Sequence, residues 1–279
     1  MSYCIALSGK GGSGKTTLAS LTVKYLLSRG AAPVFAVDAD PNSNFADQLG
    51  VEQYGTVGDI REELLAVKDQ IPAGMAKADF IRYRIAETVT ESRGFDLLNM
   101  GRPEGPGCYC YVNSLLRDYL DSRGKNYPAV VIDNEAGMEH LSRRTTRDVD
   151  LLLIVTDLTQ VSITAALRIG ALARSLDLAI RAMGVVVNRA AEVPAPVRDQ
   201  MRAAGLDVLG CVPPDPLVES MARDGTPLLG LSEESAAFSA FAGILDARGV
   251  AAAAGRGGVA AAAAGQSAAA RPAAGAEQS

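Results

Sequence analysis

The sequence contains no tryptophan, and aromatic residues make up only 5% of its 279 residues. No apolar run approaches the roughly 18 residues that a membrane-spanning helix needs, so we expect no membrane partner. The first ten residues also lack the basic start and the cleavage signal of a secretory peptide. We therefore expect a cytoplasmic protein whose four cysteines are reduced.

The chain also has no excess of positively charged residues. The chain has 27 Lys and Arg against 32 Asp and Glu, which gives a formal net charge of −5. Proteins that bind nucleic acid generally use a basic surface to neutralise phosphates. The acidic balance therefore argues against a nucleic-acid partner.

Short apolar runs alternate with segments long enough for helices, a pattern typical of βαβ units and a parallel sheet. The fold class that we predict is α/β, a doubly wound, mostly parallel sheet of about seven strands with helices on both faces. The runs expected to form strands are YCIAL, VFAV, DLLNM, AVVID, LLLIV, GVVVN and DVLG.

The helices that we expect in this domain include Lys15–Arg29, Tyr109–Arg123 and Ser162–Leu176. We interpret residues 58–93 as mostly helical and find no reliable strand signal in them. Ser232–Arg248 is expected to be the last helix, with Ser232 as its N-cap. We place one domain at residues 1–248 and interpret the Ala/Gly-rich residues 249–279 as a disordered tail, because they have almost nothing to bury.

A phosphate-binding loop is indicated at Gly9–Thr16, which matches the pattern GxxxxGK[ST] between a predicted strand and a predicted helix. Glycines allow backbone N–H groups to point at phosphate oxygens, and the helix N-terminus adds positive potential. Lys15 is expected to reach the β- and γ-phosphates, and the Thr16 hydroxyl to bind Mg²⁺. The predicted nucleotide-binding residues of the loop are Gly11, Gly12, Ser13, Gly14, Lys15, Thr16 and Thr17.

The second lysine of the loop, Lys10, gives the form KGGxGK[ST]. This form resembles the deviant Walker A loop of the SIMIBI class of P-loop ATPases, which includes the nitrogenase iron protein and the MinD and ParA group. In that class the early lysine reaches the phosphates of a dimer partner. The resemblance therefore implies a homodimer in which Lys10 is catalytic in trans.

The same resemblance implies roles for three carboxylates that follow buried strands. Asp40 is the counterpart of the residue that prepares the attacking water, and Asp38 is expected to orient its loop or to lie near Mg²⁺. Asp133 matches a Walker B aspartate that holds Mg²⁺ through water. The ends of parallel strands are where an open α/β sheet binds its ligand.

Recognition of adenine is predicted for two segments late in the chain. Asn188 follows the strand GVVVN, and its amide can both donate to and accept from the edge of adenine. A GTPase would need an Asp three residues later, where this chain has Ala191. The segment VPPDP, with Pro213, Pro214 and Asp215, matches the loop that covers adenine in the SIMIBI class. We therefore expect ATP rather than GTP.

A CxC pair, Cys108 and Cys110, lies between a Pro/Gly-rich loop and a predicted helix. A disulfide within one such pair would be strained. Two thiolates are too few for a closed metal site, but a twofold dimer would supply four sulfurs for zinc, nickel, copper or an iron–sulfur cluster.

Four segments together resemble the CooC-type ATPases that mature carbon monoxide dehydrogenase. They are GKGGSGKTT, DADPNSN, RPEGPGCYCYVN and VIDNEAGMEHLSRR, and the likeness spans about residues 1–248. The resemblance implies an ATP-driven metallochaperone with ATP, Mg²⁺ and Ni²⁺, or Zn²⁺ in vitro, and with carbon monoxide dehydrogenase as its client. The metal would be bound by Cys108 and Cys110 of both subunits.

Two alternatives stay open from the sequence. The first is an ATP-dependent reductase with an interfacial iron–sulfur cluster. The nitrogenase iron protein has a cluster-binding cysteine at the position where this chain has His140, its only histidine. We expect His140 to form ordinary hydrogen bonds. The second is a positioning ATPase of the ParA or MinD type, which the CxC pair does not fit. Cys4 and Cys211 are expected to be core residues.

Overall fold

The computed structural model describes residues 2–40, 44–52, 55–66, 75–101, 119, 125–134, 148–175 and 179–256. In this part of the chain an eight-stranded sheet has the order β3-β4-β2-β5-β1-β6-β7-β8. The strands are β1 (Tyr3–Gly9), β2 (Val34–Ala39), β3 (Val89–Ser92), β4 (Phe95–Asn99), β5 (Ala129–Asn134), β6 (Asp148–Thr156), β7 (Ala179–Asn188) and β8 (Val208–Val212). The helices are α1 (Lys15–Ser28), α2 (Phe45–Leu49), α3 (Val57–Ala66), α4 (Lys77–Glu87), α7 (Gln160–Ser175), α8 (Ala195–Ala203), α9 (Pro216–Asp224) and α10 (Ala236–Ala247), with a 3₁₀ turn at Leu228–Gly230.

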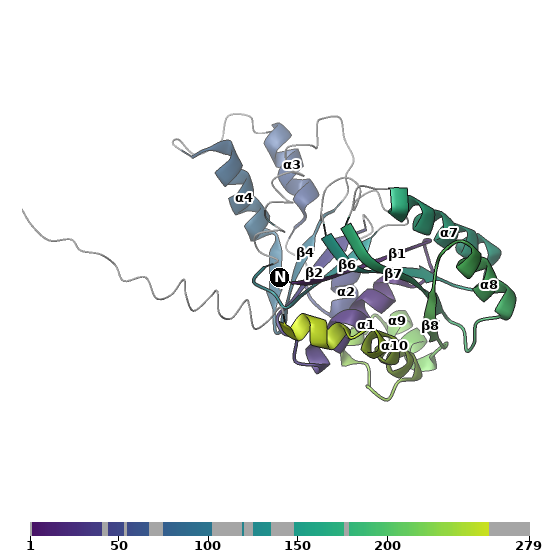
Figure 1. Cartoon of the computed structure of the whole chain (residues 1–279). Coiled ribbons are helices and arrows are strands. Elements are labelled where there is room, and N and C mark those ends of the chain that lie inside the picture. Colours follow the sequence, from purple (N-terminus) through teal and green to yellow (C-terminus); the bar gives the residue numbers. More distant parts are fainter. Residues whose placement is uncertain are drawn as a thin grey trace, which may run out of the picture.

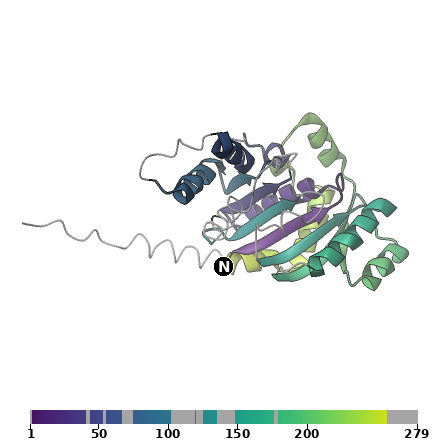
Figure 2. The ribbon, with the colours of Figure 1, turned by 90° about the horizontal axis from the view of Figure 1, so that it is seen from above.

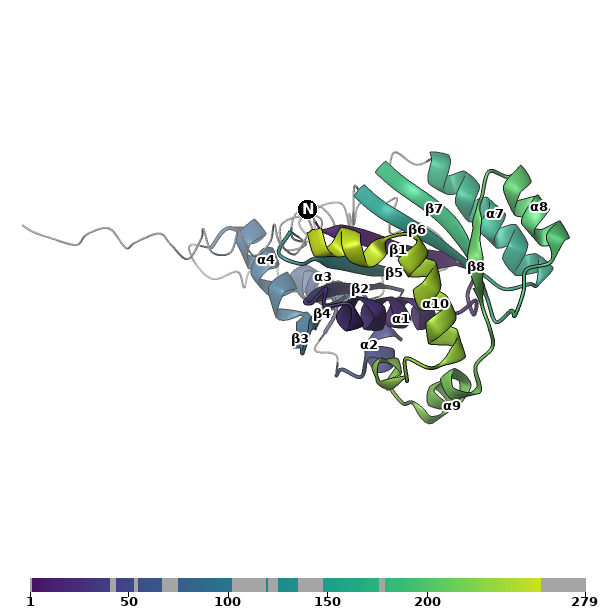
Figure 3. The same cartoon turned by 60° about the horizontal axis from the view of Figure 1, so that its bottom comes forward.

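Helices cover both faces of the sheet, which confirms the doubly wound α/β prediction (Figure 1). Alternate residues of each central strand point to opposite faces, as the period of two requires. In β1, Ile5 and Leu7 pack with α1, α2 and α10, while Cys4 and Ala6 pack with the opposite layer. α1 and α10 lie across one face (Figure 3), whereas α3 with α4, and α7 with α8, lie at opposite ends of the other face (Figure 2).

All seven predicted strands are present and run parallel to one another. The eighth, β3, is an antiparallel edge strand that pairs with β4 through the turn at Arg93 and Gly94. Residues 58–93, in which no reliable strand signal was found, therefore do contain a strand. The four residues VTES carry too little apolar periodicity to reveal a strand, and β4 supplies the pairing that the local sequence does not encode.

The last predicted helix begins later than expected, at Ala236. Its N-cap is Ser235, whose hydroxyl accepts the Phe238 N–H at 3.2 Å, whereas the Ser232 hydroxyl accepts the Glu234 N–H in the preceding turn. The Ser232 cap was therefore a wrong prediction, made because several residues in this segment can cap a helix.

Helical structure continues beyond the boundary predicted at residue 248. Val250–Arg256 is helical and bent by 61° from α10, and Val250 and Ala254 are fully buried against the α1 layer. The tail beyond Arg256 lies outside the described residues and stays a prediction. Among the described helices, none alone combines the length and apolar character of a membrane span, and only this bent pair meets those criteria jointly.

Candidate functional site

The predicted phosphate loop connects the end of β1 to the start of α1, at the carboxyl edge of the sheet. Gly12 and Gly14 have φ angles of +79° and +93°, which side chains other than glycine rarely adopt. The Ser13 N–H donates to the Lys10 carbonyl at 3.1 Å and closes the turn. A Cβ atom on Gly11 or Gly12 would meet no atom within 4 Å, so the outer rim of the loop is open to a ligand.

Lys15 begins α1 and lies inside the loop that precedes it. Its side chain is buried, and its ammonium donates to the Lys10 carbonyl at 3.4 Å. This long hydrogen bond is weak compensation for burying a charge, so an anion is a better partner for the ammonium. Thr16 and Thr17 follow on the first turn of α1 and are half-buried.

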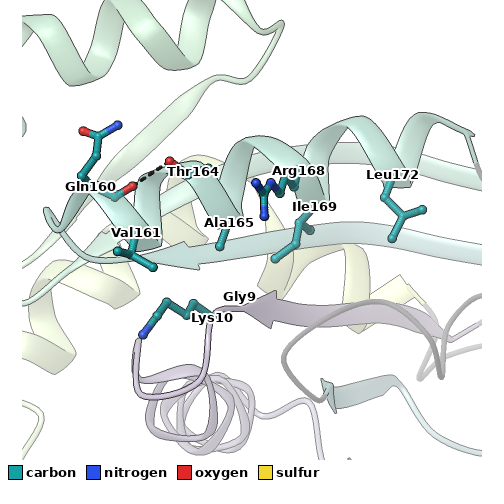
Figure 4. A pocket seen from close by; sticks show the side chains of 9 residues that line it. All are labelled: Gly9, Lys10, Gln160, Val161, Thr164, Ala165, Arg168, Ile169 and Leu172. Atoms are coloured by element: carbon teal, nitrogen blue, oxygen red, sulfur yellow. Dashed lines mark hydrogen bonds between the residues drawn. The ribbon is translucent and has the colours of Figure 1, made fainter.

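Lys10 points away from this interior. Its ammonium donates only to the Gly11 carbonyl among the described residues, at 3.3 Å, and the contact is exposed. The side chain borders a groove of about 550 Å³ between the end of β1 and α7 (Figure 4). The groove is lined by Gly9, Lys10, Gln160, Val161, Thr164, Ala165, Arg168, Ile169 and Leu172. Val161 is 64% exposed, so a large apolar side chain lies on the surface beside Lys10.

The two carboxylates that were predicted to lie near Mg²⁺ are brought together by strand register. β2 and β5 pair with Asp38 opposite Asp133, and β1 and β5 pair with Leu7 opposite Asp133. Both carboxylates are fully buried. Burial raises the pKa of Asp38 to about 6 and that of Asp133 to about 7.

Asp38 orients its loop, one of the two roles predicted for it. One oxygen accepts the Asp40 N–H at 3.0 Å and the other accepts the Phe45 N–H at 3.1 Å. These bonds lower its pKa but do not offset burial. Because both donors lie on the segment that follows β2, Asp38 ties the backbone of Asp40 to the sheet.

Asp133 has a different environment. Among the described residues no hydrogen-bond donor meets either of its carboxylate oxygens. After burial, the charges of Asp38 and Asp40 raise its pKa, while the Thr16 hydroxyl and the Lys15 ammonium lower it. A buried carboxylate with so few donors fits a hydrated divalent cation, and the half-buried Thr16 hydroxyl next to it is a second suitable oxygen. The residues present therefore fit Mg²⁺.

Asn188 lies at the end of β7, as predicted, and it contacts the phosphate loop. Its amide nitrogen donates to the Ser13 carbonyl at 2.9 Å, and its amide oxygen accepts the Arg189 N–H at 3.0 Å. A Cβ atom on Gly14 would lie 2.1 Å from the same amide nitrogen, so this approach requires glycine. Its predicted contact with adenine stays a prediction.

Pro213, Pro214 and Asp215 form the link between β8 and α9. The carboxylate of Asp215 is buried and already serves as a cap, because it accepts the Leu217 N–H at 2.9 Å, the Ser235 hydroxyl at 2.6 Å and the Ala237 N–H at 3.1 Å. These bonds, led by the one from Ser235, lower the pKa of Asp215. Asp215 therefore joins the starts of α9 and α10, and its predicted contact with nucleotide stays a prediction.

The predicted metal ligands Cys108 and Cys110, together with His140, lie outside the described residues. Within the described ranges no cluster of three or more potential metal ligands occurs. Cys4 is buried in the core, as predicted. Cys211 is only half-buried, and its thiol donates to the Ala191 carbonyl at 3.3 Å.

Two residues at this sheet edge were not predicted from the sequence. The Asn134 amide donates to the Leu7 carbonyl at 2.8 Å and so connects the end of β5 to the strand that leads into the phosphate loop. The Arg189 guanidinium donates to the Gly12 carbonyl at 3.1 Å. Asn134 directly follows Asp133, and Arg189 directly follows Asn188; both preceding residues were predicted to belong to the site. This adjacency is the only indication of their roles that the sequence offers.

Comparisons with known proteins identify similar sequences and structures. The family model of the CobQ/CobB/MinD/ParA nucleotide binding domain matches residues 4–228. An uncharacterized ATP-binding protein of Methanocaldococcus jannaschii is 45% identical over 234 residues, which cover 83% of this chain and 92% of that protein. The carbon monoxide dehydrogenase accessory protein CooC of Rhodospirillum rubrum is 33% identical over 243 residues, or 82% of this chain and 90% of that protein.

Among solved structures, the cell division ATPase MinD of Pyrococcus furiosus aligns with a TM-score of 0.63 at 21% identity, covering 88% of this chain and 98% of that one. MinD of Pyrococcus horikoshii, solved in complex with Mg-ADP, aligns with a TM-score of 0.62 at 20% identity, covering 88% and 96%. At such identities the likeness establishes the shared fold alone.

Proposed function

Because the chain belongs to the CobQ/CobB/MinD/ParA family of nucleotide-binding P-loop ATPases, we propose that it hydrolyses ATP as a homodimer and delivers nickel to carbon monoxide dehydrogenase. The observation that carries the client assignment is the 33% identity with the CooC accessory protein of Rhodospirillum rubrum over 82% of this chain. The CxC pair at Cys108 and Cys110 supports the metal assignment.

In the proposed hydrolysis, Lys15 exchanges its weak contact with the Lys10 carbonyl for the β- and γ-phosphates of ATP. Asp40, whose backbone Asp38 holds, orients the attacking water. Thr16 and Asp133 would hold Mg²⁺, which when bound neutralises charge on the phosphate oxygens. Lys10 of the partner adds a second cation, so that hydrolysis depends on closure of the dimer.

The path of the chain supports a shared thiolate site on the same edge of the sheet. Gly101 follows β4, and β4 is three strand positions from β1, or about 14 Å at the usual strand spacing. Cys108 lies seven residues further along the chain than Gly101, and seven extended residues reach about 23 Å. The CxC pair is therefore within reach of the edge that carries Lys10, where a twofold axis would bring two pairs together.

The double substitution Cys108→Ser/Cys110→Ser is expected to abolish metal binding while ATP is still hydrolysed. The wild-type dimer, reduced and loaded anaerobically with Ni²⁺, should hold about one nickel ion, because four thiolates complete one tetrahedral site. Elemental analysis with light scattering measures the ratio, and Cys211→Ser is the matched control for loss of a thiol elsewhere. Iron and sulfide in the purified protein would instead favour the reductase. Absence of any metal would contradict the delivery role.

Val161→Lys is expected to weaken the nucleotide-dependent dimer at least about tenfold without changing ADP binding to the monomer. The groove beside Val161 already carries Lys10 and Arg168, so another cation adds repulsion and desolvation to the proposed interface. Light scattering with a non-hydrolysable ATP analogue and Mg²⁺ measures the dimer. Tyr83→Lys adds the same charge on α4, where Tyr83 is 57% exposed, and serves as the control. If both variants weaken the dimer equally, or if neither weakens it, the dimer interface lies elsewhere.

A further inference from the structure

We propose that Arg189 is a positioning residue that, together with Asn188, holds the phosphate loop in the shape that binds nucleotide. The inference rests on the nucleotide-binding part of the proposed function and does not depend on nickel. Consecutive side chains at the end of β7 donate to consecutive carbonyls of the loop, Asn188 to Ser13 at 2.9 Å and Arg189 to Gly12 at 3.1 Å. We call this pair the β7 clamp.

The β7 clamp fixes two peptide planes of the loop. A trans peptide is rigid and its C=O and N–H groups point in opposite directions, so a held carbonyl also aims the next N–H. Holding the Gly12 carbonyl aims the Ser13 N–H, which closes the turn onto the Lys10 carbonyl at 3.1 Å. Holding the Ser13 carbonyl aims the Gly14 N–H away from Asn188. Glycines supply the freedom of the loop, and the clamp restricts it.

The backbone of Arg189 is the second observation. Its φ of +55° is the only positive value at a non-glycine position among the described residues. Glycine or asparagine adopts this left-handed conformation more readily than arginine does. The conformation is held on both sides, since the Arg189 N–H donates to the Asn188 amide oxygen and the Ala190 N–H donates to the Val212 carbonyl at 2.9 Å. Such outliers persist where the surrounding structure enforces them, and they concentrate at functional sites.

This position also links the two halves of the predicted nucleotide site. Val212, to which Ala190 is bonded, ends β8 and directly precedes Pro213 and Pro214, the segment expected to cover adenine. Arg189 therefore contacts the phosphate loop directly, and its neighbour Ala190 is bonded to the strand end that precedes the predicted adenine-covering segment. Because its partner is a backbone carbonyl, Arg189 acts through the loop and not on the base.

The test compares Arg189→Gln, Arg189→Lys and the matched control Arg202→Gln. Arg202 is an exposed arginine whose described ion pair, with Asp199, is long at 3.7 Å. The probes are ADP with Mg²⁺ and inorganic tripolyphosphate with Mg²⁺. We expect Arg189→Gln to weaken both about five- to tenfold, because a charged donor to the loop is lost. Arg189→Lys keeps a cationic donor and should lose less than about threefold, and Arg202→Gln should lose nothing.

Arg189→Gly separates this role from a contribution to folding. Glycine relieves the left-handed backbone, so the melting temperature should stay or rise while ADP binding weakens as in Arg189→Gln. The KM for ATP should rise by the same factor with kcat within about twofold, because loop N–H groups bind the ground state and the transition state alike. Unchanged ADP binding in Arg189→Gly or Arg189→Gln would overturn the proposal, as would a loss for ADP without a loss for tripolyphosphate. Failure of the wild-type protein to bind ADP would instead overturn the proposed function.

Discussion

Lys15→Ala is expected to lower kcat for ATP hydrolysis by about two to three orders of magnitude, the usual effect of removing one preorganised donor to developing charge. Among the described residues, the only hydrogen bond that this buried ammonium donates is the long one of 3.4 Å to the Lys10 carbonyl. That hydrogen bond is too weak to explain why the ammonium is buried, whereas a bound phosphate would explain it. Steady-state phosphate release with saturating Mg²⁺ and ATP measures the loss.

A thermal scan provides the second measurement for this substitution. A ligand at about 100 times its Kd stabilises a protein by about 2.7 kcal/mol, so ADP should raise the melting temperature of the wild-type protein clearly. In Lys15→Ala the same ADP concentration should give a much smaller shift, while the ligand-free melting temperature stays near that of the wild type. Lys15→Arg, which keeps the charge but not the compact ammonium, should fail as well. Hydrolysis at the wild-type rate in either variant would show that the phosphate loop takes no part in the reaction.

The parts of the fold that the sequence predicts correctly are those encoded by local pattern. Each central strand, such as VFAV or LLLIV, is an apolar run because helices bury both of its sides. The phosphate loop is equally local, since its glycines and Lys15 must follow one strand and open one helix. β3 was missed because its order comes from pairing with β4 and not from its own four residues.

The hydrogen-bond partners of the site are the part that one sequence cannot supply. Asp215 was expected near nucleotide, yet its carboxylate is held by Ser235 and Ala237, which are 20 and 22 residues further along the chain. Asn188 and Ser13 are bonded across 175 residues. Such pairs depend on which helix starts the fold brings together, and no spacing rule predicts them. The roles of Asp40, Cys108 and Cys110 stay predictions.

Lys10→Ala is expected to reduce ATP hydrolysis by about 10³-fold or more, the effect typical of a cation supplied by a partner to phosphoryl transfer, while ADP still binds each protomer. The Lys10 ammonium is exposed beside α7 and does not enter its own loop (Figure 4). Arg168→Ala, which removes another cation from the same groove, is the matched control and should retain most activity. Phosphate release and ADP titration measure the two properties separately.

Mixing two inactive variants identifies the subunit on which Lys10 acts. A heterodimer of Lys10→Ala and Asp40→Asn has one site with its own Asp40 and with Lys10 from the partner. Random exchange makes about half of the dimers mixed, each with one complete site of two, so about a quarter of the wild-type rate should return. If Lys10 served its own subunit, neither site would be complete and no activity would return.

The backbone of Lys10 makes this prediction specific. Its carbonyl lies inside the loop, where it accepts the Ser13 N–H and the Lys15 ammonium, whereas its side chain lies outside. Alanine keeps the carbonyl and removes only the side chain, so the architecture of the loop should survive. A loss of ADP binding in Lys10→Ala would therefore contradict a role in trans, because it would mean that the side chain supports its own loop. Retained binding, lost hydrolysis and recovery on mixing would together explain why this loop carries two lysines.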